Sequence, residues 1–180
     1  MTTLSAPAAL AHRWPTAVGA LAALGMILLG PNRTAVALVV AIAATCYVAA
    51  AVFARPWMAW AWIPIAFVVV VAGKLVDVEP VVATGVAAAA LVVIGLARST
   101  TRPAVTLETA GLLVYSAFVV VALLFAPAVG LVVVALTLIA HGVWDVWHLR
   151  RHRDVVPPSL AEFCVALDVP LGLAVLVLTV

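Results

Sequence analysis

Apolar residues fill this chain in runs of about twenty, and charged residues are confined to the short breaks between the runs. Only 9% of the 180 residues are charged, whereas a soluble domain carries roughly 25%. A chain with so few charges cannot cover a surface exposed to water, so lipid must surround most of it. Because a helix needs about 20 apolar residues to cross a bilayer, the sequence predicts a multi-pass helical membrane protein.

Breaks rich in proline and charge divide the chain into seven predicted spans. They cover residues 14–29, 34–53, 57–76, 81–97, 105–125, 129–149 and 159–180. The sequence therefore predicts a single transmembrane domain over residues 1–180, an all-α bundle of about seven helices. The first span is the shortest, and we interpret it as a retained helix or signal anchor because no clean cleavage pattern follows it. Asn32 is expected to cap the second helix, and Pro80 to lie in the first turn of the fourth.

Arginine and lysine are distributed unequally between the two sides of such a bundle. One side holds Arg13, Arg55, Arg98, Arg102, Arg150, Arg151 and Arg153, and the other holds Arg33 and Lys74. The positive-inside rule places the first side, with the N-terminus, in the cytoplasm. The basic residues are few and split among short loops, which gives no support to nucleic-acid binding.

A stripe of ionisable residues runs along the sixth span. His141, Asp145, His148 and His152 fall at i, i+4, i+7 and i+11, within roughly 60° of one helix face. Ionisable groups inside a span are costly and are functional candidates by default. His141 and Asp145 lie roughly 10–13 Å inside Arg150 along the helix, or closer. The pair could share a metal ion, or the carboxylate could accept the ring N–H of a histidine.

A simpler interpretation is that this stripe is the cytoplasmic end of a membrane helix. Trp144 and Trp147 would then belong to an interfacial aromatic belt, and His148 and His152 would reach toward water. His152 fits this interpretation best, whereas His141 lies deeper.

The last span contains Glu162, Cys164 and Asp168. Ser159-x-x-Glu162 matches a capping box, which explains Glu162 as a helix-initiating residue. Asp168 lies about three turns into an apolar helix, and we expect it to face the sixth span and pair with a histidine or a histidine-bound metal. Glu108, in the first turn of the fifth span, either completes the site or favours the helix dipole. Both cysteines, Cys164 and Cys46, are expected to be buried free thiols.

Imidazole and carboxylate groups suit zinc or iron(II), and these are the cofactors that the sequence suggests. The candidate metal ligands are His141, His148, Asp145 and Asp168. The candidate acid/base groups are Asp145, Asp168 and Glu162. Several other chemistries lack their motifs, because the chain has no H-E-x-x-H and no G-x-S-x-G. A retinal Schiff base would need a lysine deep in the last helix, and the only lysine is Lys74.

The motif His141-Gly-Val-Trp-Asp145-Val-Trp-His148, followed by Glu162-Phe-Cys164 and Asp168, resembles a pattern in small uncharacterised multi-pass bacterial integral membrane proteins. The resemblance covers roughly the last quarter of the chain. It implies a multi-pass protein of the bacterial inner membrane.

Two further resemblances concern enzymes. His141-Gly-x-x-Asp145 is similar to an element of bacterial Brp/Blh-type β-carotene dioxygenases, which implies intramembrane histidines on iron, although this chain is shorter and has fewer histidines. The span count and the His/Asp content resemble those of zinc-dependent ceramidase-like hydrolases, whose last-helix HxxxH is missing here.

Two hypotheses follow, and whether the protein is an enzyme stays open between them. The first is a metal-dependent membrane enzyme acting on a lipid or isoprenoid-like substrate. The second is a non-enzymatic transport, scaffold or accessory subunit whose polar residues are interhelical hydrogen bonds. An enzyme needs these side chains around a cavity open to lipid or cytoplasm, whereas a structural role needs them paired and closed. Small-residue helices would also permit a homo-oligomer.

Overall fold

The computed structural model describes residues 13–98 and 102–179, and every regular element within these ranges is an α-helix. The helices are α2 (Trp14–Leu28), α3 (Arg33–Phe53), α4 (Met58–Leu75), α5 (Pro80–Ala97), α6 (Arg102–Leu124), α7 (Pro127–Arg151) and α8 (Pro158–Thr179). This confirms the predicted all-α bundle, and the helix ends differ from the predicted ones by less than one turn. The N-terminal residues 1–12 and the centre of the predicted basic loop, residues 99–101, lie outside the described ranges.

Six of these helices, α3 to α8, are long and apolar enough to cross a membrane. α2 has 15 residues, so it is about 22 Å long at 1.5 Å per residue. The hydrocarbon core of a bilayer is about 30 Å thick. The multi-pass character is therefore clear from α3 to α8, while a full crossing by α2 stays a prediction.

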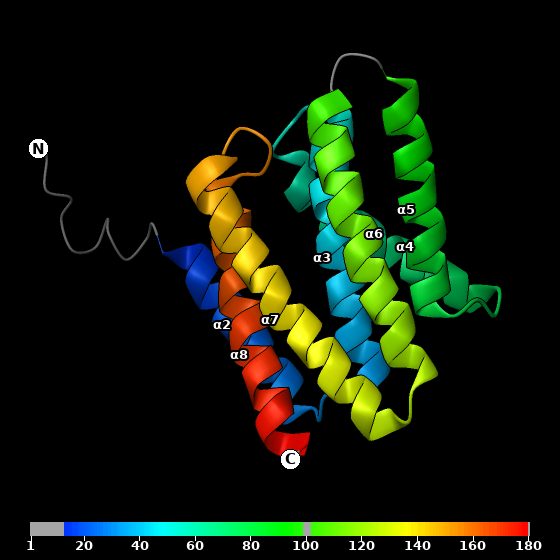
Figure 1. Ribbon diagram of the computed structural model, residues 1–180, viewed down its shortest axis with the longest axis vertical. Helices are drawn as coiled ribbons and strands as arrows, with labels where there is room; N and C mark the ends of the chain where they lie inside the picture. Colours follow the sequence, from blue (N-terminus) through cyan, green and yellow to red (C-terminus); the bar gives the residue numbers. More distant parts are fainter. Residues whose placement is uncertain (1–12, 99–101, 180) are drawn as a thin grey trace, which may run out of the picture.

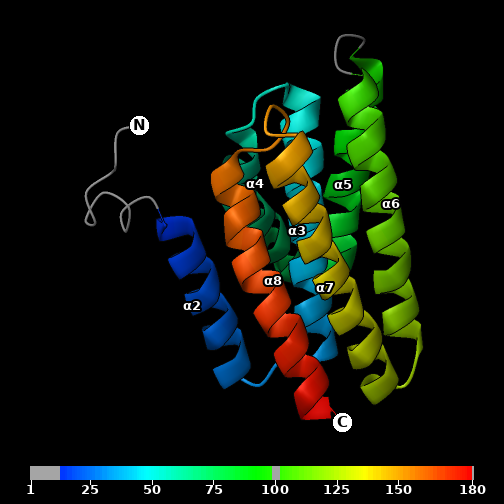
Figure 2. The same cartoon turned by 60° about the vertical axis from the view of Figure 1, so that its left-hand side comes forward.

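α3 lies at the centre of the bundle, with α2, α7 and α8 on one side and α4, α5 and α6 on the other (Figures 1 and 2). It contacts α4, α5, α6 and α7. Of its apolar stretch, 72% is buried, against 28% for α4 and 22% for α5. The helix is rich in alanine, and small side chains let neighbouring helices approach closely from several directions. The polar residues Thr45 and Tyr47 of α3 are consequently held inside protein rather than in lipid.

Glycines allow α7 and α8 to pack closely. A Cβ atom added to Gly142 would lie 2.6 Å from Val169 Cγ2, and one added to Gly172 would lie 2.9 Å from the carbonyl oxygen of Ala135. Such distances are shorter than atomic contacts allow, so any side chain at these positions would push the helices apart. Gly142 follows His141 in the chain and Val169 follows Asp168, so this close approach also brings those two polar residues together.

Local signals at the helix ends are mostly as predicted. The Asn32 side chain accepts a hydrogen bond of 2.9 Å from the Ala35 N–H at the start of α3, and Pro80 begins α5. The expected capping box at Ser159 is wrong. α8 begins one residue earlier, at Pro158, and Ser159 Oγ instead accepts a hydrogen bond of 3.0 Å from Trp60 Nε1 of α4.

Candidate functional site

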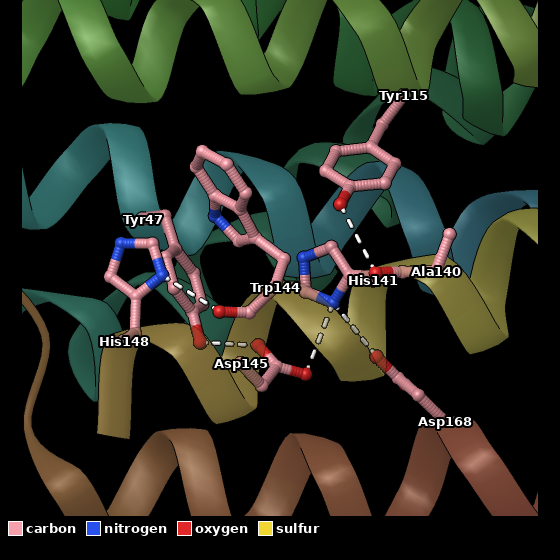
Figure 3. A network of polar contacts seen from close by, with 8 residues as sticks. All are labelled: Tyr47, Tyr115, Ala140, His141, Trp144, Asp145, His148 and Asp168. Carbon is pink, nitrogen blue, oxygen red and sulfur yellow. Dashed lines mark hydrogen bonds and ion pairs between the residues drawn. The ribbon is translucent and has the colours of Figure 1, made fainter. Parts of the chain in front are cut away.

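Three ionisable side chains from two helices meet inside the bundle. His141 Nδ1 lies 2.8 Å from Asp168 Oδ2 of α8 and 3.3 Å from Asp145 Oδ2, one turn further along α7 (Figure 3). His141 is 1% exposed, and both aspartates are 0% exposed. The prediction that Asp168 faces the sixth span and pairs with a histidine is confirmed.

A tyrosine from the central helix completes this group. The Tyr47 O–H of α3 donates a hydrogen bond to Asp145 Oδ1, and Tyr47 is 1% exposed. This bond fixes one carboxylate oxygen of Asp145 and leaves the other facing His141. Sequence reasoning missed Tyr47. Its signal is a lone phenol within an alanine-rich span, where a buried hydroxyl needs a partner.

A second tyrosine, Tyr115 of α6, contacts the other side of the imidazole. Its ring centroid lies 5.0 Å from that of His141, in an edge-on arrangement. Its O–H donates a long hydrogen bond of 3.3 Å to the carbonyl oxygen of Ala140. The Tyr47 ring lies 5.6 Å from the same imidazole. The His141 ring is thus held between two aromatic rings, which restricts its orientation.

His148 forms a separate pair with Glu108 of α6. His148 Nε2 lies 2.9 Å from Glu108 Oε1, and His148 Nδ1 lies 3.0 Å from the carbonyl oxygen of Trp144. A carbonyl oxygen can only accept, so Nδ1 carries a proton, and one further proton is shared between Nε2 and the carboxyl group. Both ring nitrogens of His148 are therefore occupied within the protein. Glu108 thus pairs with His148 rather than with the His141 group. It is 2% exposed, so it does not simply lie in a polar first turn.

The remaining predicted residues lie apart from the His141 group. Glu162 Oε1 is 3.8 Å from Arg13 Nη1 at the helix ends, and its side chain is 26% exposed. His152 directly follows α7 as its C-cap residue, and its ring packs against Trp147 with centroids 4.1 Å apart, as expected for an interfacial position. Cys46 and Cys164 are buried free thiols, as predicted.

Several buried polar atoms of the cluster have no hydrogen-bond partner among the described residues. They are His141 Nε2, Asp145 Oδ2 and Asp168 Oδ1. Two carboxylates here face at most one imidazolium, so the cluster carries surplus negative charge when both are ionised. Burying an unpaired charged oxygen is expensive, especially inside a membrane. The cluster therefore requires a cation, either a metal ion or an additional proton.

The geometry of these residues fits a metal ion. His141, Asp145 and Asp168 each offer one ligand atom, and these atoms lie within 4.8 Å of one another. Zinc binds nitrogen and carboxylate ligands at about 2.0–2.2 Å, which sets neighbouring ligand atoms about 3–3.5 Å apart. To meet this spacing, the contact of 2.8 Å between His141 Nδ1 and Asp168 Oδ2 would lengthen slightly, and the ligand atoms that lie up to 4.8 Å apart would move closer together. His148 is not part of this group.

No family model, curated protein or solved structure matches this chain. The resemblances carried by the last quarter of the sequence therefore stay predictions, and the site is interpreted from its geometry alone.

Proposed function

We propose that this protein is a metal-dependent membrane enzyme acting on a lipid or isoprenoid-like substrate, with the metal held by His141, Asp145 and Asp168. The observation that carries the proposal is the pair of buried carboxylate oxygens, Asp145 Oδ2 and Asp168 Oδ1, that accept no hydrogen bond from a described residue. A single added proton would satisfy one of these oxygens, whereas a metal ion can draw in both carboxylates and the imidazole together.

The donor set restricts the identity of the metal. One imidazole nitrogen and two carboxylate oxygens suit zinc or iron(II). Three protein ligands leave a coordination position for water or substrate, as catalytic sites require. A bound metal would supply Lewis acidity or an activated water molecule. Tyr47 would hold Asp145 in its ligating orientation, in the way that outer hydrogen bonds position metal ligands.

The surroundings favour an apolar substrate. The cluster lies among helices that are apolar enough to cross a bilayer. A lipid-facing groove of about 430 Å³ lies between α6 and α7, and Tyr115, which touches His141, forms part of its wall. Small-molecule sites typically occupy about 300–1,000 Å³. We place the protein in the bacterial cell membrane with its N-terminus in the cytoplasm, in accordance with its arginine distribution.

The alternative is a non-enzymatic membrane subunit in which the same residues hold helices together or carry a proton. The burial of the cluster favours this alternative, because His141, Asp145 and Asp168 are at most 1% exposed. Interhelical hydrogen bonds between polar side chains stabilise membrane bundles without any chemistry.

Lipid turnover separates the two functions. Purified protein would be reconstituted into liposomes made from a bacterial lipid extract, in zinc-loaded, iron-loaded and chelator-treated forms. The enzyme predicts that at least one metal-loaded form changes the lipid mass spectrum, and that Asp145→Asn abolishes the change. A protein that retains its metal but leaves every lipid unchanged would support the non-enzymatic alternative.

A further inference from the structure

We propose that the substrate enters sideways from the bilayer, between α6 and α7, and that an oxygen acceptor on it binds His141 Nε2, the imidazole nitrogen that faces away from the proposed metal ligands. This rests on the proposed metal centre and deepens it, because it names the entry side and the chemistry of the substrate. The substrate class is an apolar chain carrying a carbonyl-type oxygen, as in an ester or an aldehyde.

The first observation is the unpartnered nitrogen of His141. Nδ1 faces both aspartates, so it is the nitrogen available to a metal shared with them. A neutral imidazole that binds metal through Nδ1 carries its proton on Nε2, which is then a donor. Metal-binding histidines almost always donate this second N–H to an acceptor. Among the described residues, none accepts from His141 Nε2, so the acceptor is free to come from a ligand.

The second observation is a narrow crevice beside this nitrogen. Its walls include Ala44 and Tyr47 of α3, Glu108 and Gly111 of α6, and His141. In Figure 3, the Nε2 side of the His141 ring points away from the two aspartates and toward Trp144, which also lines the crevice. The crevice is too narrow to hold a water molecule. Water therefore does not satisfy Nε2 in the closed state.

Tyr115 connects this crevice to the bilayer, because it lines both the crevice and the outer groove of about 430 Å³. The groove is otherwise apolar except for Thr137, whose hydroxyl donates to the carbonyl oxygen of Val133. Its wall residues Val114, Phe118 and Leu136 are each about half exposed to the lipid side. Tyr115 is held by one hydrogen bond of 3.3 Å to the Ala140 carbonyl oxygen, which is longer than most N–H or O–H donors make. Rotation of the Tyr115 side chain would give up this hydrogen bond and the edge-on contact with His141, and it would join the groove to the crevice.

The groove has room for an apolar chain, and the crevice would take one small polar group once Tyr115 has turned aside. Tyr47, Glu108 and His141 give the crevice polar walls, while a charged head group would find no counter-ion on the apolar groove that precedes it. A neutral ester or aldehyde at the end of a chain meets both requirements. An ordinary annular lipid would occupy the groove but would not reach His141.

Photolabelling tests the route. Zinc-loaded protein in phosphatidylethanolamine–phosphatidylglycerol liposomes would be irradiated with a methyl palmitate probe carrying a diazirine in its chain. A hexadecane diazirine without the ester is the reference, and labelled peptides are located by mass spectrometry. We expect labelling of α6 and α7 around Val114 and Leu136. The yield of labelled α6 and α7 peptides should be about fivefold higher with the ester probe than with the hydrocarbon probe, because one hydrogen bond contributes a free energy on this scale.

Two tryptophan variants provide the matched comparison. Val114→Trp fills the groove, whereas Val71→Trp places the same side chain on an equally lipid-facing position of α4; the two valines are 53% and 56% exposed. The first should reduce ester labelling of α6 and α7 about fivefold, and the second should leave it unchanged, with equal metal content in both. Leu136→Trp, on α7, replaces Val114→Trp should that variant misfold.

Equal labelling by ester and hydrocarbon, or labelling spread evenly over the lipid-facing helices, would mean annular lipid only and would overturn the route. Parallel metal analysis keeps this failure distinct from failure of the proposed function. A metal-loaded protein without ester preference refutes the lateral site, whereas a protein that takes up no metal refutes the centre itself.

Discussion

Asp168 Oδ2 of α8 lies 2.8 Å from His141 Nδ1 of α7. The two helices come this close because the next residue of α7, Gly142, has no side chain to hold them apart. The contact joins the last two helices in the most buried part of the protein, since neither residue is more than 1% exposed. A glycine beside the histidine is thus as important for the site as the acid itself, because it sets the distance between the helices.

Replacement of Gly142 tests this spacing. Gly142→Leu should lower the thermal midpoint of the detergent-solubilised protein and reduce its metal content, because the new side chain would overlap Val169 and force α8 outward. The matched control is Gly85→Leu on α5, where an added Cβ meets no atom within 4 Å, and which should leave both properties unchanged. Normal metal binding by Gly142→Leu would show that close packing of α7 and α8 does not position the site.

Tyr47 is expected to tune the metal centre through Asp145. Tyr47→Phe removes the hydroxyl that donates to Asp145 Oδ1 and should weaken zinc affinity about 10–100-fold, the usual effect of losing an outer-shell partner. Tyr115→Phe removes a hydroxyl that bonds only a backbone carbonyl and should change the affinity little. Competition with a fluorescent zinc chelator measures both variants, and equal affinities would exclude this role of Tyr47.

The protonation of the His148–Glu108 pair can be distinguished by two substitutions. Glu108→Gln retains a donor for Nε2 of a neutral His148 and should preserve most of the stability. Glu108→Ala leaves buried Nε2 without a partner and should cost about 1–3 kcal/mol. Unfolding in detergent with a graded denaturant compares the two variants. If Glu108→Gln lowers the free energy of unfolding as much as Glu108→Ala does, the His148–Glu108 pair is ionic rather than a neutral hydrogen bond.

The orientation in the membrane follows from the arginines and can be measured directly. Arg151→Cys, on the predicted cytoplasmic side, should be protected from a membrane-impermeant maleimide in intact cells, whereas Lys74→Cys should react. The native thiols Cys46 and Cys164 are buried and should contribute little background. The reverse labelling pattern would place the N-terminal side outside the cell.

Much of the fold could be predicted from the sequence because its signals are local. Proline and charge mark the breaks between spans, and Asn32 and Pro80 mark helix starts by their own chemistry. Asp168 could also be assigned a histidine partner, because an acid three turns inside an apolar helix has few other ways to be satisfied. The capping role of Ser159 was predicted wrongly because helix ends shift easily by one residue. Its hydroxyl oxygen instead accepts a hydrogen bond from the indole N–H of Trp60.

The division of the histidines could not be predicted, because a shared helix face does not reveal which neighbour each residue meets. His148 lies seven residues, or about 10.5 Å, from His141 along the helix axis. In the structure Glu108 of α6 pairs with His148, and the group that could hold a metal ion is formed by His141, Asp145 and Asp168 without it. Tyr47 was missed because its partner Asp145 is 98 residues away in the sequence, and only the helix arrangement brings the two side chains together.

The most direct test of the metal centre is the metal content of the purified protein. Elemental analysis would compare the wild type with Asp168→Asn, and with Glu162→Gln as a control on the same helix whose acid pairs with Arg13 instead. The account predicts close to one zinc or iron per chain in the wild type and in Glu162→Gln, and loss of the metal in Asp168→Asn. A folded wild-type protein that holds no metal after reloading with either ion would contradict it.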